Sequence, residues 1–563
     1  MKKLIIILTL IAHHFSLAGC EENFLSRLST LERLTSLNQE SERIKELEKK
    51  LTSLNTKKIS KKQRGLLKKI FSNSGKKENQ SVKKQIAQIT SEIQRLKKTN
   101  REKNLKALEL VLLTTEGQYI QDHLNLERLK KLNSKQTVTI LAGTSGTQPD
   151  PQMQTELTEL VSQFISRGYF ILYESNSPYA KLIQSLAQKS SFGISNQPTK
   201  QRGQVYIKNT YLRAQALFNT SEKIITTPDS TTGFAGLFNN EIDIIFDPKK
   251  EWNFSLHQWK QDLDLMNINM GVRTKEIPIF DQATTVTTAI KKIPSSPIYS
   301  KSYFNQEFDL AGEPIRTSPH VETEIFPIIT KQFKPKKITL SDLSDYQIDH
   351  IVKEVTELLI GQEDLTGVRG AAVFGTGRDE NPFENLIFKS GLALGSLDIS
   401  ITTGGAGGAM KTSNTAAISS HVPSVGIPIT GKHTLKTEKK VEKEHHSLTV
   451  SSSGYETRIP LLLHEKQLVV FVPGGSGTMK EFWITILKLL ENPKEKLEII
   501  FVGDDYYSGL KNQIDSSSIP QFIKDRIHFV KNDFELKITI ETLFSFGLLD
   551  EEIYFFNKKR NKR

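Results

Sequence analysis

The stretch of residues 468–483, LVVFVPGGSGTMKEFW, most constrains what this chain can fold into. Residues 468–472 are a short apolar run of the kind that a parallel sheet buries on both faces, and Pro473 ends it. The glycines that follow allow backbone angles and a close ligand approach that other residues forbid. Thr478 is expected to cap the next helix, whose N–H groups and dipole favour an anion, and Glu481 is expected on its first turn. The alternative is a plain strand–turn–helix connection without a ligand.

Two earlier segments also predict a strand that runs into a glycine turn. Residues 371–377 read AAVFGTG, and residues 399–410 read ISITTGGAGGAM. An open α/β sheet places its ligand beyond the carboxyl ends of its parallel strands, so these turns are expected to share one site. The second turn lacks the G-x-G-x-x-G spacing of a dinucleotide fold, which argues against NAD.

Four features in the same order resemble the LOG family, the cytokinin-activating phosphoribohydrolases and their bacterial nucleotide-nucleosidase relatives, many once labelled lysine decarboxylases. The family motif PGGxGTxxE is matched by Pro473, Gly474, Gly475, Gly477, Thr478 and Glu481. Arg458 stands fifteen residues before the proline, as in the family. The turn ending in Met410, with Asn414 after it, and the strand of residues 371–377 are similar to the family's earlier elements. The resemblance covers roughly residues 350–550.

The resemblance implies a nucleoside 5′-monophosphate phosphoribohydrolase, which splits the N-glycosidic bond to give free base and ribose 5-phosphate without a cofactor. Glu481 and Arg458 are the implied catalytic residues. The implied phosphate- and nucleotide-binding residues are Gly474, Gly475, Ser476, Gly477, Thr478, Gly404, Gly405, Gly407, Gly408, Gly375 and Thr376. Ile459 and Lys411 depart from the family's usual lysine and glutamate, which bears on substrate choice. A non-catalytic nucleotide- or phosphosugar-binding lipoprotein and an envelope scaffold remain alternatives.

A second, degenerate copy of this pattern is predicted upstream. When Pro228 is placed on Pro473, an offset of 245, Arg213 falls on Arg458. Asp229 and Ser230 then replace two glycines, and Gly236 stands where Glu481 stands. An aspartate at this position repels a phosphate, so we expect this copy to keep the fold and lack the chemistry. Chance likeness between two α/β segments is the alternative. The LOG family builds its site at a dimer interface, so the first copy is a candidate for the second subunit of an intrachain pseudo-dimer; a homodimer is the other arrangement.

The N-terminus resembles a bacterial lipoprotein signal. Lys2 and Lys3 precede a short apolar run at residues 4–11, which is too short to span a bilayer. Residues 17–20 read LAGC, similar to a lipobox, and Cys20 is the only cysteine in the chain. We therefore expect lipidation at Cys20 and a lipid-anchored protein of the bacterial cell envelope, on the periplasmic side of a membrane in a diderm. The other interpretation is a chance cysteine after an apolar start.

The remaining segments complete the predicted organisation of the 563 residues, a length that suits two or three domains. Apolar residues at 82, 86, 89, 93 and 96 follow a heptad, which predicts helices in a hairpin, a coiled coil or a packed subdomain. The fold class is α/β, with two Rossmann-like doubly wound parallel-sheet domains in tandem behind a helical, coiled-coil-like region. The boundaries are a signal peptide (1–19), a helical arm (20–135), a degenerate LOG-like domain (136–280), an irregular connector (281–345), a LOG-like domain with an intact motif (346–550) and a basic tail (551–563).

Charge and composition set limits on the partners. The 76 basic and 63 acidic residues leave a net charge of +13, spread over lysine-rich helical segments that are typical of solvated faces. Basic and aromatic residues do not interleave as in a nucleic-acid module, so we expect no nucleic-acid partner. His433, His445 and His446 lie in a charged segment, but the absence of nearby cysteines and paired acids argues against a metal site. The bilayer and a nucleoside monophosphate are the expected partners.

Overall fold

The computed structural model describes most of the predicted α/β regions and part of the helical arm. The described residues are 46–47, 49, 75–112, 117–130, 132, 136–199, 203–238, 242–250, 252, 277–290, 338–379, 381–429, 445–517 and 519–550. The signal peptide, Cys20, the basic tail, His433 and most of the connector lie outside these residues. The predictions made for them therefore remain predictions.

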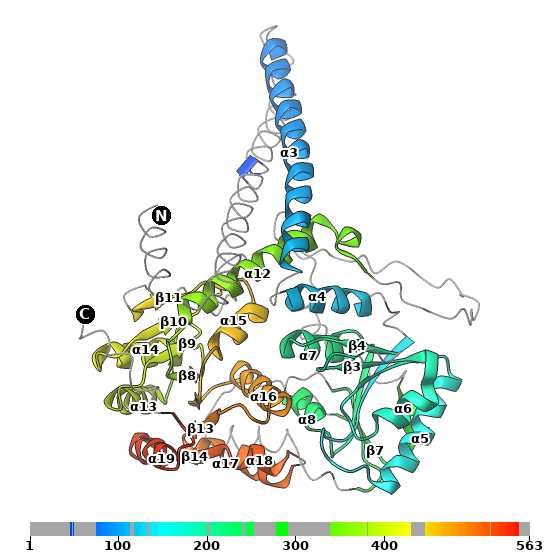
Figure 1. The fold of residues 1–563 in the computed structure, drawn as a ribbon, viewed down its shortest axis with the longest axis vertical. Helices are drawn as coiled ribbons and strands as arrows, with labels where there is room; N and C mark the ends of the chain where they lie inside the picture. Colours follow the sequence, from blue (N-terminus) through cyan, green and yellow to red (C-terminus); the bar gives the residue numbers. More distant parts are fainter. Residues whose placement is uncertain are drawn as a thin grey trace, which may run out of the picture. The chain divides into compact units, whose positions relative to one another are not determined.

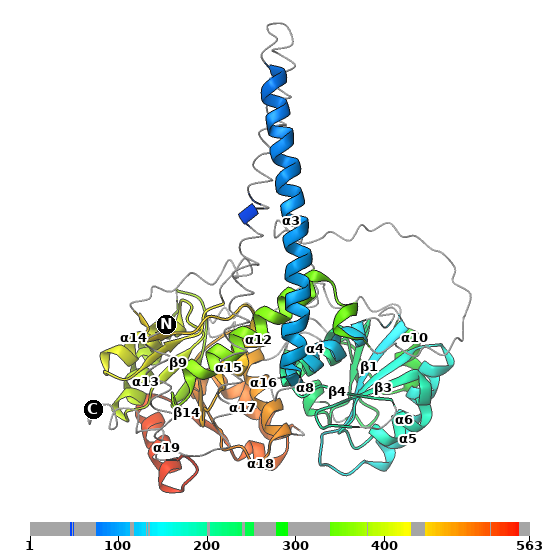
Figure 2. The same cartoon turned by 45° about the horizontal axis from the view of Figure 1, so that its top comes forward.

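The chain divides into two compact units, of which the first contains Met1–Gln121 and Ile338–Ile360. Its described part is built on helix α3 (Gly75–Val111), which is long and continuous (Figure 2) and confirms a helix over the predicted heptad. Arg101 on α3 pairs with Asp345, and Asn104 Nδ2 donates a hydrogen bond of 2.6 Å to Asp349 Oδ1. These contacts hold α3 to α12 (Asp345–Leu365), and a short 3₁₀ turn, η3 (Leu340–Asp342), precedes α12.

The second unit contains Asp122–Lys337 and Gly361–Arg563 and holds two parallel sheets (Figure 1). The first sheet has the strand order β4-β3-β2-β1-β5-β6-β7, and we call it, with its helices, the first domain. Helix α4 leads into it. Its elements are α4 (Gly117–Lys130), β1 (Thr137–Leu141), α5 (Pro151–Ser166), β2 (Phe170–Glu174), α6 (Ala180–Ala187), η2 (Gln188–Ser190), β3 (Ser191–Ser195), β4 (Gln204–Tyr206), α7 (Thr210–Asn219), β5 (Lys223–Thr226), α8 (Thr231–Phe238), β6 (Ile244–Phe246), β7 (Ile279–Phe280) and α10 (Ala283–Ala289).

The second sheet has the order β11-β10-β9-β8-β12-β13-β14, and we call it, with its helices, the second domain. Its elements are β8 (Ala371–Phe374), α13 (Glu384–Ser396), β9 (Ile401–Thr403), α14 (Ala409–Ser419), β10 (Ser424–Gly426), β11 (Leu448–Thr449), α15 (Tyr455–Leu462), β12 (Leu468–Phe471), α16 (Ser476–Glu491), β13 (Glu498–Val502), α17 (Asp504–Ser516), α18 (Gln521–Lys524), β14 (Ile527–Val530) and α19 (Asp533–Ser545). Both sheets therefore run fourth, third, second, first, fifth, sixth and seventh strand, which confirms the predicted fold class.

The core of the second domain covers both faces of its sheet. Side chains from α13, α14 and α19 pack on one face around Val470 and Ile401. On the other face, Phe471 stacks between Phe374 and Phe501, with ring centroids 5.2 and 5.0 Å apart, and α16 adds Phe482. Because all four residues of β12 are buried, the strand reads as an uninterrupted apolar run.

Two strands of the second sheet are short. Strand β9 begins only at Ile401, because the chain first leaves α13 through Asp398, whose φ of 55° is left-handed. Strand β10 ends at Gly426, since Pro428 has no N–H to continue the ladder. Among the described helices, none combines the length and apolar character that crossing a bilayer requires.

Candidate functional site

The three predicted glycine turns meet at one edge of the second sheet. Strand β8 lies between β9 and β12, so the loops that follow these strands are neighbours. The Thr376 N–H donates to the carbonyl of Pro473 over 3.3 Å, and the Ala409 N–H donates to the carbonyl of Thr376 over 2.8 Å. The loop after β8, with Gly375, therefore joins the other two. This brings segments about 100 residues apart in the chain to one place at the carboxyl ends of the strands.

The loop after β12 enters α16 earlier than the sequence predicts. The helix begins at Ser476, with Gly475 as its N-cap, and no side chain caps it. Thr478 is thus the third helical residue, and the prediction that it caps the helix is wrong. Its buried side chain instead packs on Gly474, where an added side-chain carbon would collide with it. The N–H groups of the first turn, which includes Gly477, lack intrahelical acceptors and are oriented as an anion site requires.

Glu481 lies on the second turn of α16, and the prediction that it lies on the first turn is wrong because the helix starts at Ser476. Its side chain is buried, with 9% of the residue exposed. It is five positions beyond the first helical residue, Ser476, which corresponds to about 7.5 Å along the helix axis. Glu481 therefore places a buried carboxyl side chain on α16, the helix whose N-terminus faces the glycine loops.

Glycine is required at two positions of the loop after β9. At Gly404 a side-chain carbon would fall on the guanidinium of Arg458. Gly408 has φ 61° and ψ −133°, a combination that is essentially restricted to glycine. The Gly408 N–H donates to Asp379 Oδ1 over 3.3 Å. Gly405 and Gly407 complete this buried turn, so the loop has both the special conformation and the close approach that the sequence predicts.

Arg458 is buried beside this loop, with 1% of the residue exposed. It is the fourth residue of α15, and its Nη2 lies 3.5 Å from the sulfur of Met410. Its guanidinium carbon lies 5.6 Å from the centre of the Tyr455 ring, a distance that suits a cation–π contact. The arginine predicted from its spacing to Pro473 therefore lies against the glycine turn of Gly404.

Several side chains around the site were not predicted. The Tyr506 hydroxyl donates to the carbonyl of Gly474 over 2.8 Å, and the Tyr507 hydroxyl donates to the carbonyl of Val472 over 2.7 Å. Burial raises the pKa of both tyrosines, so both remain protonated donors that hold the loop. Only the packing of α17 beneath the loop shows what these two adjacent tyrosines do.

Lys480 lies between aromatic rings of the two domains. Its ammonium is 5.6 Å from the centre of the Tyr455 ring and 5.8 Å from that of Tyr211, which belongs to α7 of the first domain. Helix α16 also packs on α7 and α8. The first domain thus contributes an aromatic side chain next to the helix that bears Glu481, which no local sequence signal indicates.

The equivalent region of the first domain is filled by the chain's own carboxylates. Asp229, which the predicted alignment of the two segments pairs with Gly474, accepts hydrogen bonds from the Gly143 N–H (3.2 Å), the Tyr179 hydroxyl (3.2 Å) and the Thr227 hydroxyl. The Thr232 hydroxyl on the first turn of α8 donates to Glu174 over 2.8 Å. Burial raises the pKa of Glu174. The aspartate therefore occupies the loop as the sequence predicts.

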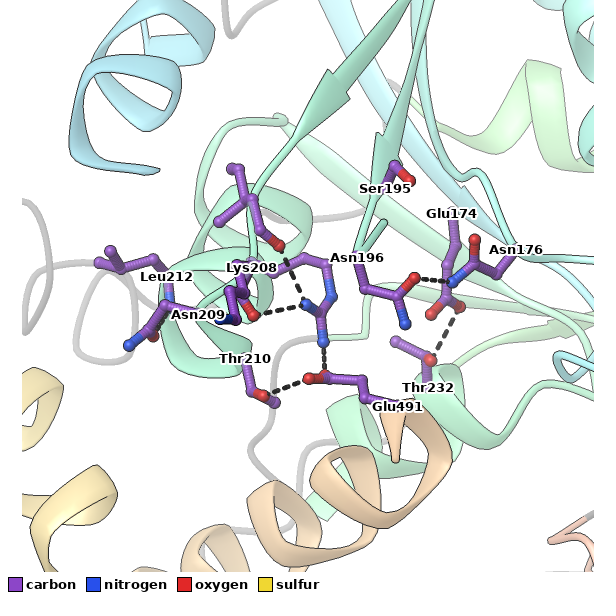
Figure 3. Close-up of polar contacts among 12 residues, drawn as sticks. Glu174, Asn176, Ser195, Asn196, Lys208, Asn209, Thr210, Leu212, Thr232 and Glu491 are labelled. Atoms are coloured by element: carbon purple, nitrogen blue, oxygen red, sulfur yellow. Dashed lines mark hydrogen bonds and ion pairs between the residues drawn. The ribbon is translucent and has the colours of Figure 1, made fainter. Parts of the chain in front are cut away.

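A third carboxylate reaches this region from the second domain. Glu491, at the end of α16, pairs with Arg213 and accepts a hydrogen bond of 2.6 Å from the Thr210 hydroxyl (Figure 3). Burial lowers the pKa of Arg213 to about 10 and nearby carboxylates such as Glu174 oppose this shift, so the guanidinium is charged at neutral pH. The predicted alignment of the two segments singled out Arg213, but no feature of the sequence indicated that Glu491 is the partner of this arginine.

The histidines weighed as metal ligands have other surroundings. His445 Nδ1 lies 3.3 Å from the hydroxyl of Thr415, and burial lowers the pKa of His446. Within the described parts of the chain, no three His, Cys, Asp or Glu side chains gather in a way that could hold a metal ion.

Comparison with known proteins supports a LOG-like C-terminal part. Residues 410–535 match the family model described as "Possible lysine decarboxylase", a stretch that includes Arg458, the loop after β12 and Glu481. A search among curated proteins found no match. Among solved structures, the chain is similar to the molybdenum cofactor binding protein from the phototrophic bacterium Rippkaea orientalis, with 15% identity over 31% of this chain and 96% of that chain and a TM-score of 0.24.

Proposed function

We propose that the protein is a nucleoside 5′-monophosphate phosphoribohydrolase that releases the free base and ribose 5-phosphate. The observation that supports this most is the convergence of two glycine loops, the N-terminus of α16 and Arg458 at one sheet edge, with Glu481 on the same helix. Residues 410–535 match the family described as "Possible lysine decarboxylase", a label that many LOG-family members once carried, and this supports the resemblance from which the proposal starts.

In this proposal the substrate's 5′-phosphate binds the N–H groups of residues 474–478. Anions are stabilised at a helix N-terminus by its unpaired N–H groups and its dipole. The turn of residues 404–408 and the loop with Gly375 and Thr376 form the adjoining wall in this proposal. The Thr376 N–H donates to the Pro473 carbonyl, and the Ala409 N–H donates to the Thr376 carbonyl. Arg458 supplies the positive charge that balances the phosphate or the departing base.

The proposed chemistry is hydrolysis, which needs neither a cofactor nor a redox partner. A water oxygen bonds to C1′ of the ribose while its proton passes to the carboxylate of Glu481. The C1′–N bond breaks, and its electron pair leaves with the base. The base nitrogen takes up one proton from solvent, and Glu481 returns the proton that it took from water to solvent, so the overall reaction consumes one water molecule. Glu481 also stabilises the positive charge that develops on the ribose ring, which is why a carboxylate near the sugar is needed.

The first domain is proposed to be a degenerate copy of the second. Three pairs of elements begin 245 residues apart, namely α7 and α15, β5 and β12, and α8 and α16. Arg213 and Arg458 are each the fourth residue of their helix. The packing of α16 on α7 and α8 supports an intrachain pseudo-dimer, in which the first domain takes the place of a second subunit.

The cellular setting is proposed from the N-terminal sequence. Lipidation at Cys20 would hold the protein on a bilayer of the bacterial cell envelope. Phosphorylated nucleotides are scarce outside the cytoplasm, so scavenged nucleotides are the proposed substrates. The alternative for this location is an envelope protein that binds a nucleotide or phosphosugar without cleaving it.

The test is base release from a panel of nucleoside monophosphates by the full-length protein and by Glu481→Gln. The amide keeps the shape of the side chain but cannot accept the water's proton, so turnover should fall by orders of magnitude while thermal unfolding is unchanged. Glu495→Gln, at a partly exposed carboxylate four residues beyond the end of the same helix, is the matched control and should retain activity. Full activity of Glu481→Gln would refute the mechanism. Ligand-induced thermal stabilisation without base release would favour the binding protein.

A further inference from the structure

We propose that the Glu491 carboxylate is a built-in ligand of the first domain, occupying the anion position beside Arg213. The contact closes the first domain's site and makes Arg213 a positioning residue for α16, the helix that bears Glu481. The contact between Glu491 and Arg213 does not depend on the reaction that the protein catalyses. Only the effect of this contact on turnover rests on the proposed function.

Arg213 is placed like an anion-binding arginine, and the anion that it contacts is a carboxylate of the same chain. Its guanidinium is buried and contacts the carboxylate of Glu491, which in turn accepts a hydrogen bond from Thr210 on the first turn of α7. Arg213 Nη1 donates to the carbonyls of Ile207 (3.0 Å) and Lys208 (3.3 Å), which fix its direction. The carboxylate thus lies near the N-terminus of α7, where the helix dipole favours a negative charge.

The other anion positions of the first domain are also filled. Asp229 occupies the loop that follows β5, and Glu174 accepts from Thr232 at the start of α8. A phosphate entering this region would meet three carboxylates and a single buried arginine. The pocket that remains is lined by both domains, including Thr232, Arg213, Leu487 and Leu490 (Figure 3 shows its polar contacts). The first domain is therefore closed to an anionic nucleotide.

The arrangement is one-sided, and the lengths of two helices explain why. Helix α8 ends at Phe238, which corresponds to Trp483 at the offset of 245, whereas α16 continues for two further turns to Glu491. The first domain consequently has no helical residue at the position that Glu491 holds. Helix α16 can therefore close the first domain's site with Glu491. Residues Thr231–Phe238 of α8 include no carboxylate that could do the same in the second domain.

The same helix connects the contact to the proposed active site. Glu481 precedes Glu491 by ten residues on α16, and Gly475 is the N-cap of this helix. Because a helix is stiff over about 15 Å, a fixed C-terminal end restrains the direction in which Glu481 and the first-turn N–H groups point. Removing one member of a buried pair leaves an uncompensated charge, whereas removing both with apolar replacements is better tolerated.

The experiment measures thermal unfolding of full-length Glu491→Ala, Arg213→Met and the double variant, with sodium acetate as the probe and sodium chloride at equal ionic strength as the reference. Acetate supplies the missing carboxylate. It should raise the Tm of Glu491→Ala by at least about 2 °C over chloride, through binding to the folded state, and should not do so for the wild type or the double variant. The double variant should be more stable than Glu491→Ala alone.

Two further variants test whether the acetate response is specific to the Glu491 position. Glu495→Ala removes a partly exposed carboxylate that pairs with Lys488 away from Arg213, so it should change the Tm less than Glu491→Ala does and show no acetate response. Glu491→Gln serves if the alanine variant does not fold, because it retains an acceptor for Thr210. An unchanged Tm for Glu491→Gln, equal effects of acetate and chloride on Glu491→Ala, or additive effects of the two single changes would each overturn the inference.

A kinetic measurement separates positioning from general stability. In Glu491→Ala, the kcat for base release should fall at a temperature well below unfolding, and acetate should restore it. If the wild type releases no base, the proposed function fails, while the acetate response of the Tm still decides whether Glu491 is the built-in ligand.

Discussion

The guanidinium of Arg458 lies in the space that a side chain on Gly404 would occupy. The two residues belong to α15 and to the loop after β9, and the buried arginine reaches the glycine turn only because residue 404 has no Cβ. The buried positive charge of Arg458 therefore depends on the absence of a side chain at residue 404 in the loop after β9.

Gly404→Ala should displace Arg458 and destabilise the second domain by about 1–3 kcal/mol, since the added methyl group enters a filled space. Base release should fall together with stability because the arginine no longer lies against the loop. Gly477→Ala is the steric control for stability, as its added carbon meets no atom within 4 Å. Urea unfolding of both variants measures the difference, and equal stabilities would contradict the close approach.

Tyr506→Phe should loosen the glycine loop without emptying the core. The change removes one hydrogen bond, to the carbonyl of Gly474, at a net cost of about 0.5–1.5 kcal/mol. We expect a higher KM for the nucleotide because the loop that is proposed to bind the phosphate is less well held. Tyr507→Phe removes a hydrogen bond to Val472, at the strand end, and serves as a comparison. Steady-state kinetics that show the same KM in both variants and the wild type would exclude this role.

Asp229→Ala should cost stability but not activity. The carboxylate satisfies the Gly143 N–H and the hydroxyls of Tyr179 and Thr227, so its removal should cost about 1–3 kcal/mol. Base release below the unfolding temperature should match the wild type, since the first domain's loop takes no part in the reaction. Asp229→Asn keeps an acceptor and should lose less stability. A large loss of kcat in Asp229→Ala would place the first domain in the chemistry.

Lys466→Met should stabilise the protein in a pH-dependent way. Burial lowers the pKa of Lys466 to about 7, and its Nζ donates to the carbonyl of Val368. Between pH 7 and the lysine's ordinary pKa of 10.5, the unfolded chain binds a proton that the folded protein has released. The wild type therefore gains stability as pH rises through this window.

The Met variant lacks this proton linkage, so its advantage in unfolding free energy should be largest near pH 7 and below, and should shrink toward pH 10. Urea unfolding of the two proteins at pH 7, 8.5 and 10 measures the difference. A difference independent of pH would show that Lys466 keeps its charge in the folded state.

Much of the second domain's site could be predicted because its requirements are local. A strand that ends in Pro473, glycines that permit a tight turn, and a helix after them are all encoded within a few residues, so the loop after β12 was located correctly. The helix start was misplaced, and with it the roles of Thr478 and Glu481, because a glycine N-cap leaves no side-chain signal. Tyr506 was not assigned, since its contact with Gly474 depends on how α17 packs under the loop.

The sequence by itself determined the α/β class, the two parallel-sheet domains and the position of the glycine loop after β12. These follow from apolar periodicity, turn residues and spacing, which act over short stretches of chain. Only the tertiary structure decided that Arg458 lies against Gly404 and that Glu491 reaches Arg213, 278 residues away. A buried charge is stabilised by whichever opposite charge the packing brings near it, and that depends on the length of α16 and its packing on α7 and α8.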